Sequence, residues 1–283
     1  MYKVAVILAV HNRCALTKDF LNSVRRQTFK EFVTIVVDDG STDNTSSMVT
    51  ENFPEVVLLK GDGNLWWTGA TNLAIRHAIE NYKVDYICTV NDDTILDSSF
   101  LEGLYQVASL DPKRIVGGFS YDIEKKGQLL YDGSVVNWLT GKITCLNSWQ
   151  DNSGNEQLLE LTYYIGRGVM IPSSVFSEVG YYDAVRFPQS WADNELIFRA
   201  KRSGYKVYST KSARQFIYSD ESKHIKLKTN KSLANYKAYL FKQQGGGNVV
   251  AFSKYIVRSY PWFAIPTSLV GGVLRRVMGY WLS

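Results

Sequence analysis

Cysteine and proline are scarce in this 283-residue sequence, and each scarcity excludes a class of protein. The cysteines, Cys14, Cys88 and Cys145, are widely spaced and form no CxxC pair, which argues against a disulfide framework or a zinc cluster. Only 6 residues are proline and 45% are hydrophobic, so the chain is neither disordered nor of low complexity. We therefore expect a packed protein of a reducing compartment.

Long apolar runs are also lacking. The run near the N-terminus stops at His11 and no small-residue cleavage site follows it, so we interpret it as a first strand and not as a signal peptide. The run from Trp262 to Leu274 contains Pro266 and is shorter than the roughly 20 residues that a spanning helix needs. The sequence therefore predicts no membrane-spanning helix.

The common glycine-rich phosphate loops are absent as well. Gly61-Asp62-Gly63-Asn64 begins like a dinucleotide-binding GxGxxG loop, but Trp66 stands where the third glycine would be. No GxxxxGK(S/T) sequence occurs either. A Rossmann dehydrogenase and a P-loop enzyme are both disfavoured.

Acidic side chains are nearly missing from the last part of the chain. The whole sequence has 32 Lys and Arg against 27 Asp and Glu, a net charge of +5. Residues 199–283 hold 16 of the basic side chains and only Asp220 and Glu221 as acids, a net charge of +14, which leaves −9 for residues 1–198. The carboxylates thus gather where a cation site would be expected, and the positive charge where an anionic surface would be met.

The sequence does contain alternating strands and helices, which predict an α/β fold with a mostly parallel sheet. Nearly continuous β-branched runs predict buried strands at 4–10, 32–38, 55–60 and 85–91. Helical patterns between and after them lie at 15–27, 43–52, 69–82, 193–203 and 230–243, and a further strand is expected at 205–210. Residues 114–172 alternate polar and apolar side chains and predict a small antiparallel addition to the sheet.

Polar residues follow the predicted strands where each one ends, and ligands of open α/β sheets bind at such ends. The turn after the second strand begins with Asp38 and Asp39, whose carboxylates suit a base and ribose or, alternatively, cap the next helix. Asn91-Asp92-Asp93 places adjacent carboxylates at a buried strand end, which a divalent cation would neutralise unless the turn is simply solvated.

Two further segments have a structural and a functional interpretation. Trp66 and Trp67 either fill the core or form the apolar wall of a sugar site. Asp193 stands at the expected start of a helix, where a carboxylate either caps the helix or removes a proton from an incoming hydroxyl group. Spacing alone leaves both pairs of alternatives open.

Six segments in a fixed order resemble glycosyltransferase family 2, the inverting nucleotide-sugar transferases of GT-A fold. They read VILAVHNR, VVDDGSTDNT, GNLWWTGATNLAI, TVNDDT, GRGVMIPSSVF with EVGYYD, and WADNELIFRAKRSGYKV, and they cover about residues 4–210. The GNLWWTGATN and NDD forms resemble especially a bacterial rhamnosyltransferase-like branch that builds O-antigen or capsular polysaccharide. The resemblance implies a GT-A domain at 1–215, with a nucleotide-sugar half (1–113) and an acceptor half (114–215), and a basic, aromatic helical extension at 216–283.

The resemblance also implies a role for the residues of each motif. Asp193 matches the general base, and Asp93 matches the ligand of a divalent cation, Mg²⁺ or Mn²⁺. Nucleotide and donor contacts are implied for Ala9, His11, Arg13, Asp38, Asp39, Asn64, Trp67, Thr68, Asn72, Asn91 and Asp92. An acceptor or sugar pocket is implied for Trp66, Gly166, Arg167, Gly168 and Trp191.

The sequence departs from the family pattern at two points. Ala192 replaces the glutamate that precedes the base in relatives, which removes a partner that would orient the base. Many relatives complete the metal site with a histidine shortly after the last strand, and only Asp220 and His224 are candidates for that place here. A catalytically idle nucleotide-binding scaffold of a polysaccharide assembly complex is therefore the alternative to an enzyme.

The expected partners are a dTDP- or UDP-linked sugar and a saccharide or lipid-linked oligosaccharide acceptor. In the C-terminal segment, Leu269, Val270, Val273, Leu274, Val277 and Trp281 share a broad helical face opposite Ser268 and Arg275. Basic, aromatic segments of this kind bind anionic membrane surfaces, so we expect a cytoplasmic protein attached to the inner face of the cell membrane. The alternative is a helix packed on the domain or on a second copy in a homodimer, and a nucleic-acid partner is not expected.

Overall fold

The computed structural model describes residues 2–125, 127–138, 140, 142–145, 159–218, 231–243 and 247–282. The N-terminal half is built around parallel strands that read as apolar almost throughout because both of their faces are covered. In spatial order these strands are β3 (Val57–Lys60), β2 (Phe32–Asp38), β1 (Val4–Val10) and β4 (Tyr86–Val90). The register pairs Val10 with Asp38 and Asp38 with Lys60, so these strands end at one edge of the sheet.

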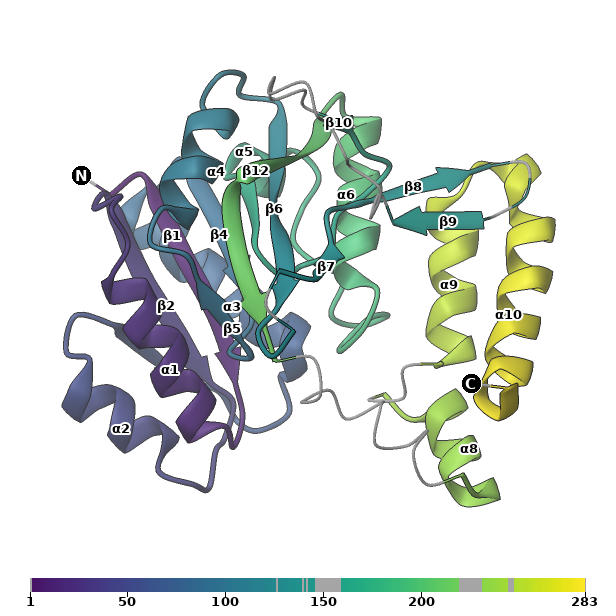
Figure 1. Cartoon of the computed structure of the whole chain (residues 1–283), viewed down its shortest axis with the longest axis horizontal. Helices are drawn as coiled ribbons and strands as arrows, with labels where there is room; N and C mark the ends of the chain where they lie inside the picture. The colour runs from purple at the N-terminus through teal and green to yellow at the C-terminus, as the bar shows by residue number, and fades with distance from the viewer. Residues whose placement is uncertain are drawn as a thin grey trace.

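The sheet continues beyond β4 in a mixed arrangement (Figure 1). Its next strands are β11 (Val169–Pro172), which is antiparallel to both neighbours, then β6 (Arg114–Asp122), β12 (Lys206–Ile217) and β10 (Leu159–Glu160). Two short strands join its margins, β5 (Thr94–Leu96) on β12 and β7 (Leu129–Tyr131) on β6. A separate hairpin consists of β8 (Ser134–Asn137) and β9 (Lys142–Cys145). The expected small antiparallel addition to a mostly parallel sheet is thereby confirmed.

Helices cover both faces of this sheet, and alternate residues of each strand face one layer or the other. Of β1, Ala5 and Ile7 pack with one core cluster, whereas Val6 and Leu8 pack with the second. The first layer contains α3 (Trp66–Tyr82), α5 (Ser174–Glu178) and α6 (Ala192–Arg202). The second contains α1 (Cys14–Arg25), α2 (Thr45–Asn52) and α4 (Phe100–Ala108).

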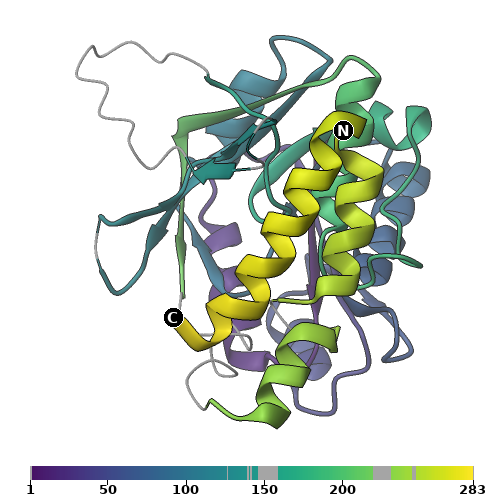
Figure 2. The same ribbon diagram turned by 90° about the vertical axis from the view of Figure 1, so that its right-hand side faces the viewer.

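The C-terminal extension is helical, as expected, and consists of α8 (Leu233–Phe241), α9 (Val249–Ser259), a 3₁₀ turn (Trp262–Ala264) and α10 (Ile265–Leu282). Figure 2 shows α9 and α10 side by side, with α8 near one end of the pair. Phe252, Tyr255 and Ile256 of α9 are buried in the same cluster as α6. The extension therefore shares a core with the rest of the chain, and the expected boundary at residue 215 falls inside β12.

Candidate functional site

The ends of the first three strands are tied together by backbone hydrogen bonds. The Asp39 amide donates to the Val10 carbonyl (2.9 Å), and the Gly61 amide donates to the Asp38 carbonyl (2.8 Å). His11 Nδ1 lies 2.6 Å from the carbonyl oxygen of Asp39. The segments that follow β1, β2 and β3 thus meet at one sheet edge, where the sequence predicted them.

Both carboxylates of the Asp38-Asp39 pair shape the surrounding loops. Asp38 accepts hydrogen bonds from the Ser41 amide (2.9 Å) and from Ser46 Oγ (2.5 Å). Asp39 accepts from the amides of Gly63 and Trp66, each at 2.9 Å. Each carboxylate oxygen has a second lone pair, so these bonds fix Asp39 in place and leave each of its oxygens able to accept one more donor.

Asn12 belongs to the same corner, although the sequence analysis did not select it. Its backbone is left-handed (φ 53°), its amide donates to Ser41 Oγ (2.8 Å) and its Oδ1 accepts from the Thr42 amide (2.7 Å). Asn tolerates this conformation better than most residues. The signal available in the sequence was its place two residues after the end of a buried strand.

Two arginines from distant segments converge on the Asp92-Asp93 pair. Arg13 Nε donates to Asp92 Oδ2 (2.8 Å), and its terminal nitrogen lies 3.8 Å from Asp93 Oδ2. Arg167 donates to the same Asp93 oxygen (3.3 Å). Burial raises the pKa of Asp92 to about 6; the Arg13 guanidinium lowers it in part and the Asp93 charge raises it further. The paired arginines explain how two adjacent carboxylates are tolerated at a buried strand end.

One carboxylate oxygen of this cluster is left free to bind a divalent cation. Asp93 Oδ1 is buried and has no hydrogen-bond partner within the described residues. One such carboxylate oxygen, completed by phosphate oxygens and water, is the usual way in which Mg²⁺ is held beside a nucleotide. In the part of the chain that the structure describes, no group of three or more His, Cys, Asp or Glu residues forms a metal site, and Asp220 and His224 lie outside that part. Asp93 therefore fits a cation that the donor helps to hold.

Asp193 lies at the first turn of α6 and is anchored by two backbone amides. Its Oδ2 accepts from the Gly166 amide (2.7 Å) and its Oδ1 from the Asn194 amide (2.8 Å). Burial of the carboxylate raises its pKa above that of an ordinary aspartate, and the amide hydrogen bonds offset only part of this shift. Asp193 is therefore both a helix-terminal acceptor and a carboxylate of enhanced basicity.

Residues 166 and 167 connect the two acidic centres. The Gly166 amide holds Asp193, and the next side chain, Arg167, holds Asp93. A Cβ at Gly166 would lie 2.7 Å from the Trp67 ring, and Trp67 Nε1 donates to Asn91 Oδ1 (3.3 Å). The loop before β11, the start of α3, the end of β4 and the start of α6 thus form one site.

Several residues of the expected site hold the scaffold beneath it. Thr68 is fully buried, and its hydroxyl group donates to the Phe187 carbonyl (2.6 Å). Asn72 is buried. Its side-chain nitrogen donates to the Tyr182 carbonyl (2.8 Å), and its side-chain oxygen accepts from the Tyr182 backbone amide (3.1 Å). These two side chains bond the backbone of the loop between α5 and α6, so they fix α3 against that loop.

The turn at Gly168 depends on a buried residue that the sequence did not reveal. Gly168 has φ +72°, and a Cβ there would lie 2.3 Å from Gln215 Nε2. Gln215 is fully buried and donates to the Arg167 carbonyl (3.2 Å) and to Ser120 Oγ (2.9 Å). Gln215 therefore fixes the backbone that presents Arg167.

The other expected residues lie around this centre. Trp66 is left-handed (φ 57°) and 37% exposed, and Asn64 is exposed with its amide on Asp62 Oδ1 (2.8 Å). Ala9 is partly buried in β1 opposite Val37. Trp191, directly before α6, stacks on Tyr255 of α9 at 4.8 Å, so the C-terminal extension reaches the edge of the site.

One protein-family model matches more than half of the chain. The family model described as "Glycosyl transferase family 2" matches residues 5–180, and the chain belongs to this family. The expected family is confirmed.

Several curated proteins share part of the sequence. "Glycosyltransferase GlyG" of Streptococcus pneumoniae is 24% identical over 195 residues, 65% of this chain and 61% of that protein. A Campylobacter jejuni GalNAc(5)-diNAcBac-PP-undecaprenol beta-1,3-glucosyltransferase is 29% identical over 129 residues, 46% of this chain and 41% of that protein. The match with GlyG thus spans about three-fifths of that relative's length.

Solved structures confirm the GT-A fold. S. aureus TarS 1-349 superposes with a TM-score of 0.57 at 14% identity, covering 99% of this chain and 91% of that one. GalNAc-T7, solved with UDP, GalNAc and Mn²⁺, gives a TM-score of 0.61 at 11% identity, covering 100% of this chain and 56% of that one. At such identities the likeness concerns the fold alone.

Proposed function

We propose that this protein is an inverting glycosyltransferase that moves a sugar from a nucleotide diphosphate to a growing bacterial glycan or lipid-linked oligosaccharide. The observation that carries the proposal is the link through consecutive residues, with Gly166 bonded to Asp193 and Arg167 bonded to Asp93. Consecutive residues thus hold the base on one side and the diphosphate site on the other. This arrangement suits a single displacement at the sugar's anomeric carbon, between the two.

The chemistry follows from the charges of these side chains. Asp193 takes the proton of an acceptor hydroxyl group while the oxygen attacks the anomeric carbon from the face opposite the nucleotide, so the configuration inverts. Arg13 and Arg167 neutralise the charge that develops on the departing diphosphate. A divalent cation bound at Asp93 would, as a Lewis acid, further stabilise the same negative charge. Arg167 thereby serves the donor in this scheme, whereas the sequence placed it in the acceptor pocket.

The donor to test first is dTDP-rhamnose, followed by UDP-linked sugars. The GNLWWTGATN and NDD segments support rhamnose through their resemblance to rhamnosyltransferase-like proteins. The undecaprenol-linked substrate in the name of the Campylobacter relative supports a lipid-linked acceptor. GalNAc-T7, which shares the fold, was solved with Mn²⁺ and UDP, and this supports a metal-dependent donor.

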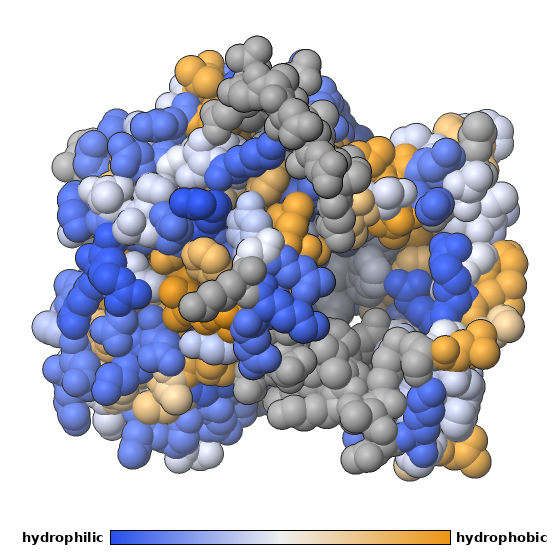
Figure 3. Space-filling view, in the orientation of Figure 1, coloured by the Kyte–Doolittle hydropathy of each residue, from blue (hydrophilic) through white to orange (hydrophobic). Residues whose placement is uncertain are grey.

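We also propose that the C-terminal extension attaches the protein to an anionic membrane surface. Large apolar side chains stand out along α10 and its preceding turn, and they colour the right-hand edge of Figure 3, where α10 lies. They are Trp262 (83% exposed), Phe263, Val270, Leu274, Met278, Trp281 and Leu282. Arg275 is exposed on the same helix, and exposed apolar, aromatic and basic residues together suit the interface of an anionic bilayer. None of the helices that the structure describes is long and apolar enough to span a membrane.

The central test of function is Asp193→Asn. Transfer should fall by at least about 100-fold because the amide cannot take the proton, while donor affinity stays within a factor of two. Product formation and donor binding are measured on the same samples. The matched control is Asp19→Asn, which removes an exposed carboxylate of α1 and should leave both quantities unchanged.

Two results would contradict the proposal. Unchanged turnover of Asp193→Asn would remove this residue from the role of base. A wild type that binds donor but transfers no sugar to any saccharide or lipid-linked acceptor would favour the idle scaffold.

A further inference from the structure

Glu195 is a buried carboxylate two residues after the proposed base, on the same first turn of α6. Its side chain is 1% exposed and meets two arginines. Arg199 Nε lies 2.9 Å from each of its oxygens, and Arg258 Nε lies 2.6 Å from Oε1. A buried carboxylate with charged partners on both sides fixes the geometry of the elements that supply them.

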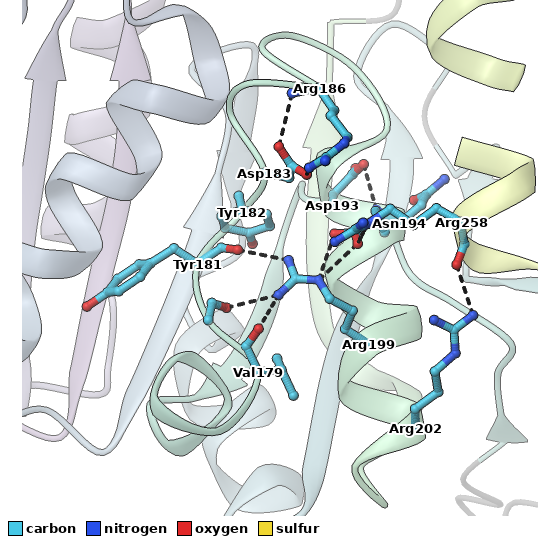
Figure 4. Close-up of polar contacts among 12 residues, drawn as sticks. Val179, Tyr181, Tyr182, Asp183, Arg186, Asp193, Asn194, Arg199, Arg202 and Arg258 are labelled. Carbon is cyan, nitrogen blue, oxygen red and sulfur yellow. Dashed lines mark hydrogen bonds and ion pairs between the residues drawn. The ribbon is translucent and has the colours of Figure 1, made fainter. Parts of the chain in front are cut away.

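Arg199 ties α6 to the loop that follows α5. Besides Glu195, its guanidinium donates to the carbonyl oxygens of Val179, Gly180 (3.4 Å) and Tyr181 (2.8 Å), as Figure 4 shows for the labelled residues. Every branch of this guanidinium is thereby engaged. These bonds hold α6 against the loop that follows α5.

Arg258 belongs to α9, so the contact with Glu195 joins the catalytic helix to the C-terminal extension. Two further bonds run in the opposite direction, because Arg202 of α6 donates to the carbonyl oxygen of Arg258 (Figure 4) and to that of Ser259, each at 3.0 Å. The two helices are thus linked at both the first and the last turn of α6.

Trp191 gives an independent observation on the same junction. It precedes α6 in a left-handed conformation (φ 75°), which costs energy for a residue with a bulky side chain. Its ring stacks on Tyr255 of α9, lies 5.5 Å from Phe252 and is covered by the Arg276 guanidinium of α10 at 5.2 Å. Contacts from the extension therefore hold the strained residue that sets where α6 begins.

We infer that α9 and α10 position the proposed base, with Arg258 and Tyr255 as positioning residues that act on Asp193 through Glu195 and Trp191. This inference rests on the proposed function, since it assigns the base to Asp193. The Gly166 and Asn194 amides aim the carboxylate only if the first turn of α6 keeps its place. Displacing a catalytic group by about 1 Å can lower a rate by about 100-fold.

The test compares Arg258→Met with Lys254→Met, which removes an exposed charge from the same helix. Arg258→Met should lower kcat by roughly 10- to 100-fold with the KM and binding stoichiometry of the donor unchanged, whereas Lys254→Met should match the wild type. Arg258→Lys keeps the positive charge but lacks the planar guanidinium group, and it should give an intermediate kcat. A merely structural role would reduce donor-binding stoichiometry in step with activity, because unfolded molecules lose both.

The outcomes separate this inference from the proposed function. An active wild type whose kcat is the same in Arg258→Met and Lys254→Met would overturn the positioning role alone. The same holds if the loss in Arg258→Met is matched by a loss of donor-binding sites. A wild type without any transferase activity would overturn the proposed function and the positioning role together.

Discussion

Asp193 lies in the first turn of α6 but does not cap the helix, because the N-cap residue is Trp191. Its carboxylate accepts a hydrogen bond from the amide of the next residue, Asn194, and a second from Gly166 across the site. Of the two interpretations that the sequence left open, helix capping is wrong and the role of base stays a prediction. Because burial raises its pKa, the carboxylate is a stronger base than an exposed aspartate would be.

This shift has a consequence for the dependence of activity on pH. The proposed base works as a carboxylate, so activity is lost as pH falls through its pKa, and a raised pKa places that loss at a higher pH than the ordinary value of about 4. The measurement is kcat/KM against pH, with donor affinity determined over the same range to separate binding from proton transfer. Constant kcat/KM down to the ordinary range of aspartate would contradict this assignment.

At this scale, residues at element ends could be predicted, and their partners could not. Asp39, Asp93 and Asp193 could be selected because they stand at the end of a buried strand or at the expected start of a helix, where a structural and a functional role were both open. The arginine that faces Asp93 comes from position 167, and the glutamine that supports its turn comes from position 215. Such pairs join segments far apart in the chain, and a single sequence holds no signal for them.

Among the elements, α10 differs most from its prediction. From the helical spacing of the sequence, Leu269, Val273 and Val277 were expected on the same face as Val270 and Leu274. In the structure Leu269 and Val273 pack on the main core and Val277 on the cluster around Tyr280, while Val270 and Leu274 are exposed. The helix is apolar on two sides because it covers the domain with one and presents the other outward. Packing on the domain and attachment to a membrane are thus compatible.

The exposed side of α10 can be tested without disturbing the core. Leu274→Ser with Met278→Ser should lower binding to phosphatidylglycerol vesicles by roughly 10-fold, because two apolar side chains no longer enter the bilayer. Leu110→Ser with Val185→Ser removes two exposed apolar side chains elsewhere and should bind like the wild type. Co-sedimentation is the measurement. Equal binding by both double variants would contradict membrane attachment through α10.

The other elements show where sequence patterns suffice. The strands predicted at 4–10 and 32–38 have those bounds in the structure, because near-continuous apolar runs between polar turns are unambiguous. Helix α4 is absent from the predicted helices, although Phe100, Leu104 and Ala108 recur at helical spacing. Strand β12 extends to Ile217, past the expected end at 210, because its pairing with β6 shifts register and then resumes. Tertiary pairing of that kind overrides local pattern.

In the molecule as a whole, the C-terminal extension contributes to the same core as the transferase domain. Tyr255 and Ile256 are at most 1% exposed, so the extension is part of the folded unit. Local pattern predicted a helix at 230–243 and a helical face at 269–281, but not α9 or its contact with α6, which depends on long-range packing.

In the proposed mechanism, the acidic strand ends form one site for a nucleotide diphosphate sugar and a divalent cation. The most direct measurement is calorimetric titration of dTDP- and UDP-linked sugars into the wild type and Asp93→Ala, with Mn²⁺ and again with EDTA. We predict saturable binding of one donor class at one site per chain, weakened by at least about 10-fold by EDTA or by Asp93→Ala. Absence of binding by every donor, or equal affinity in all four conditions, would contradict the claim.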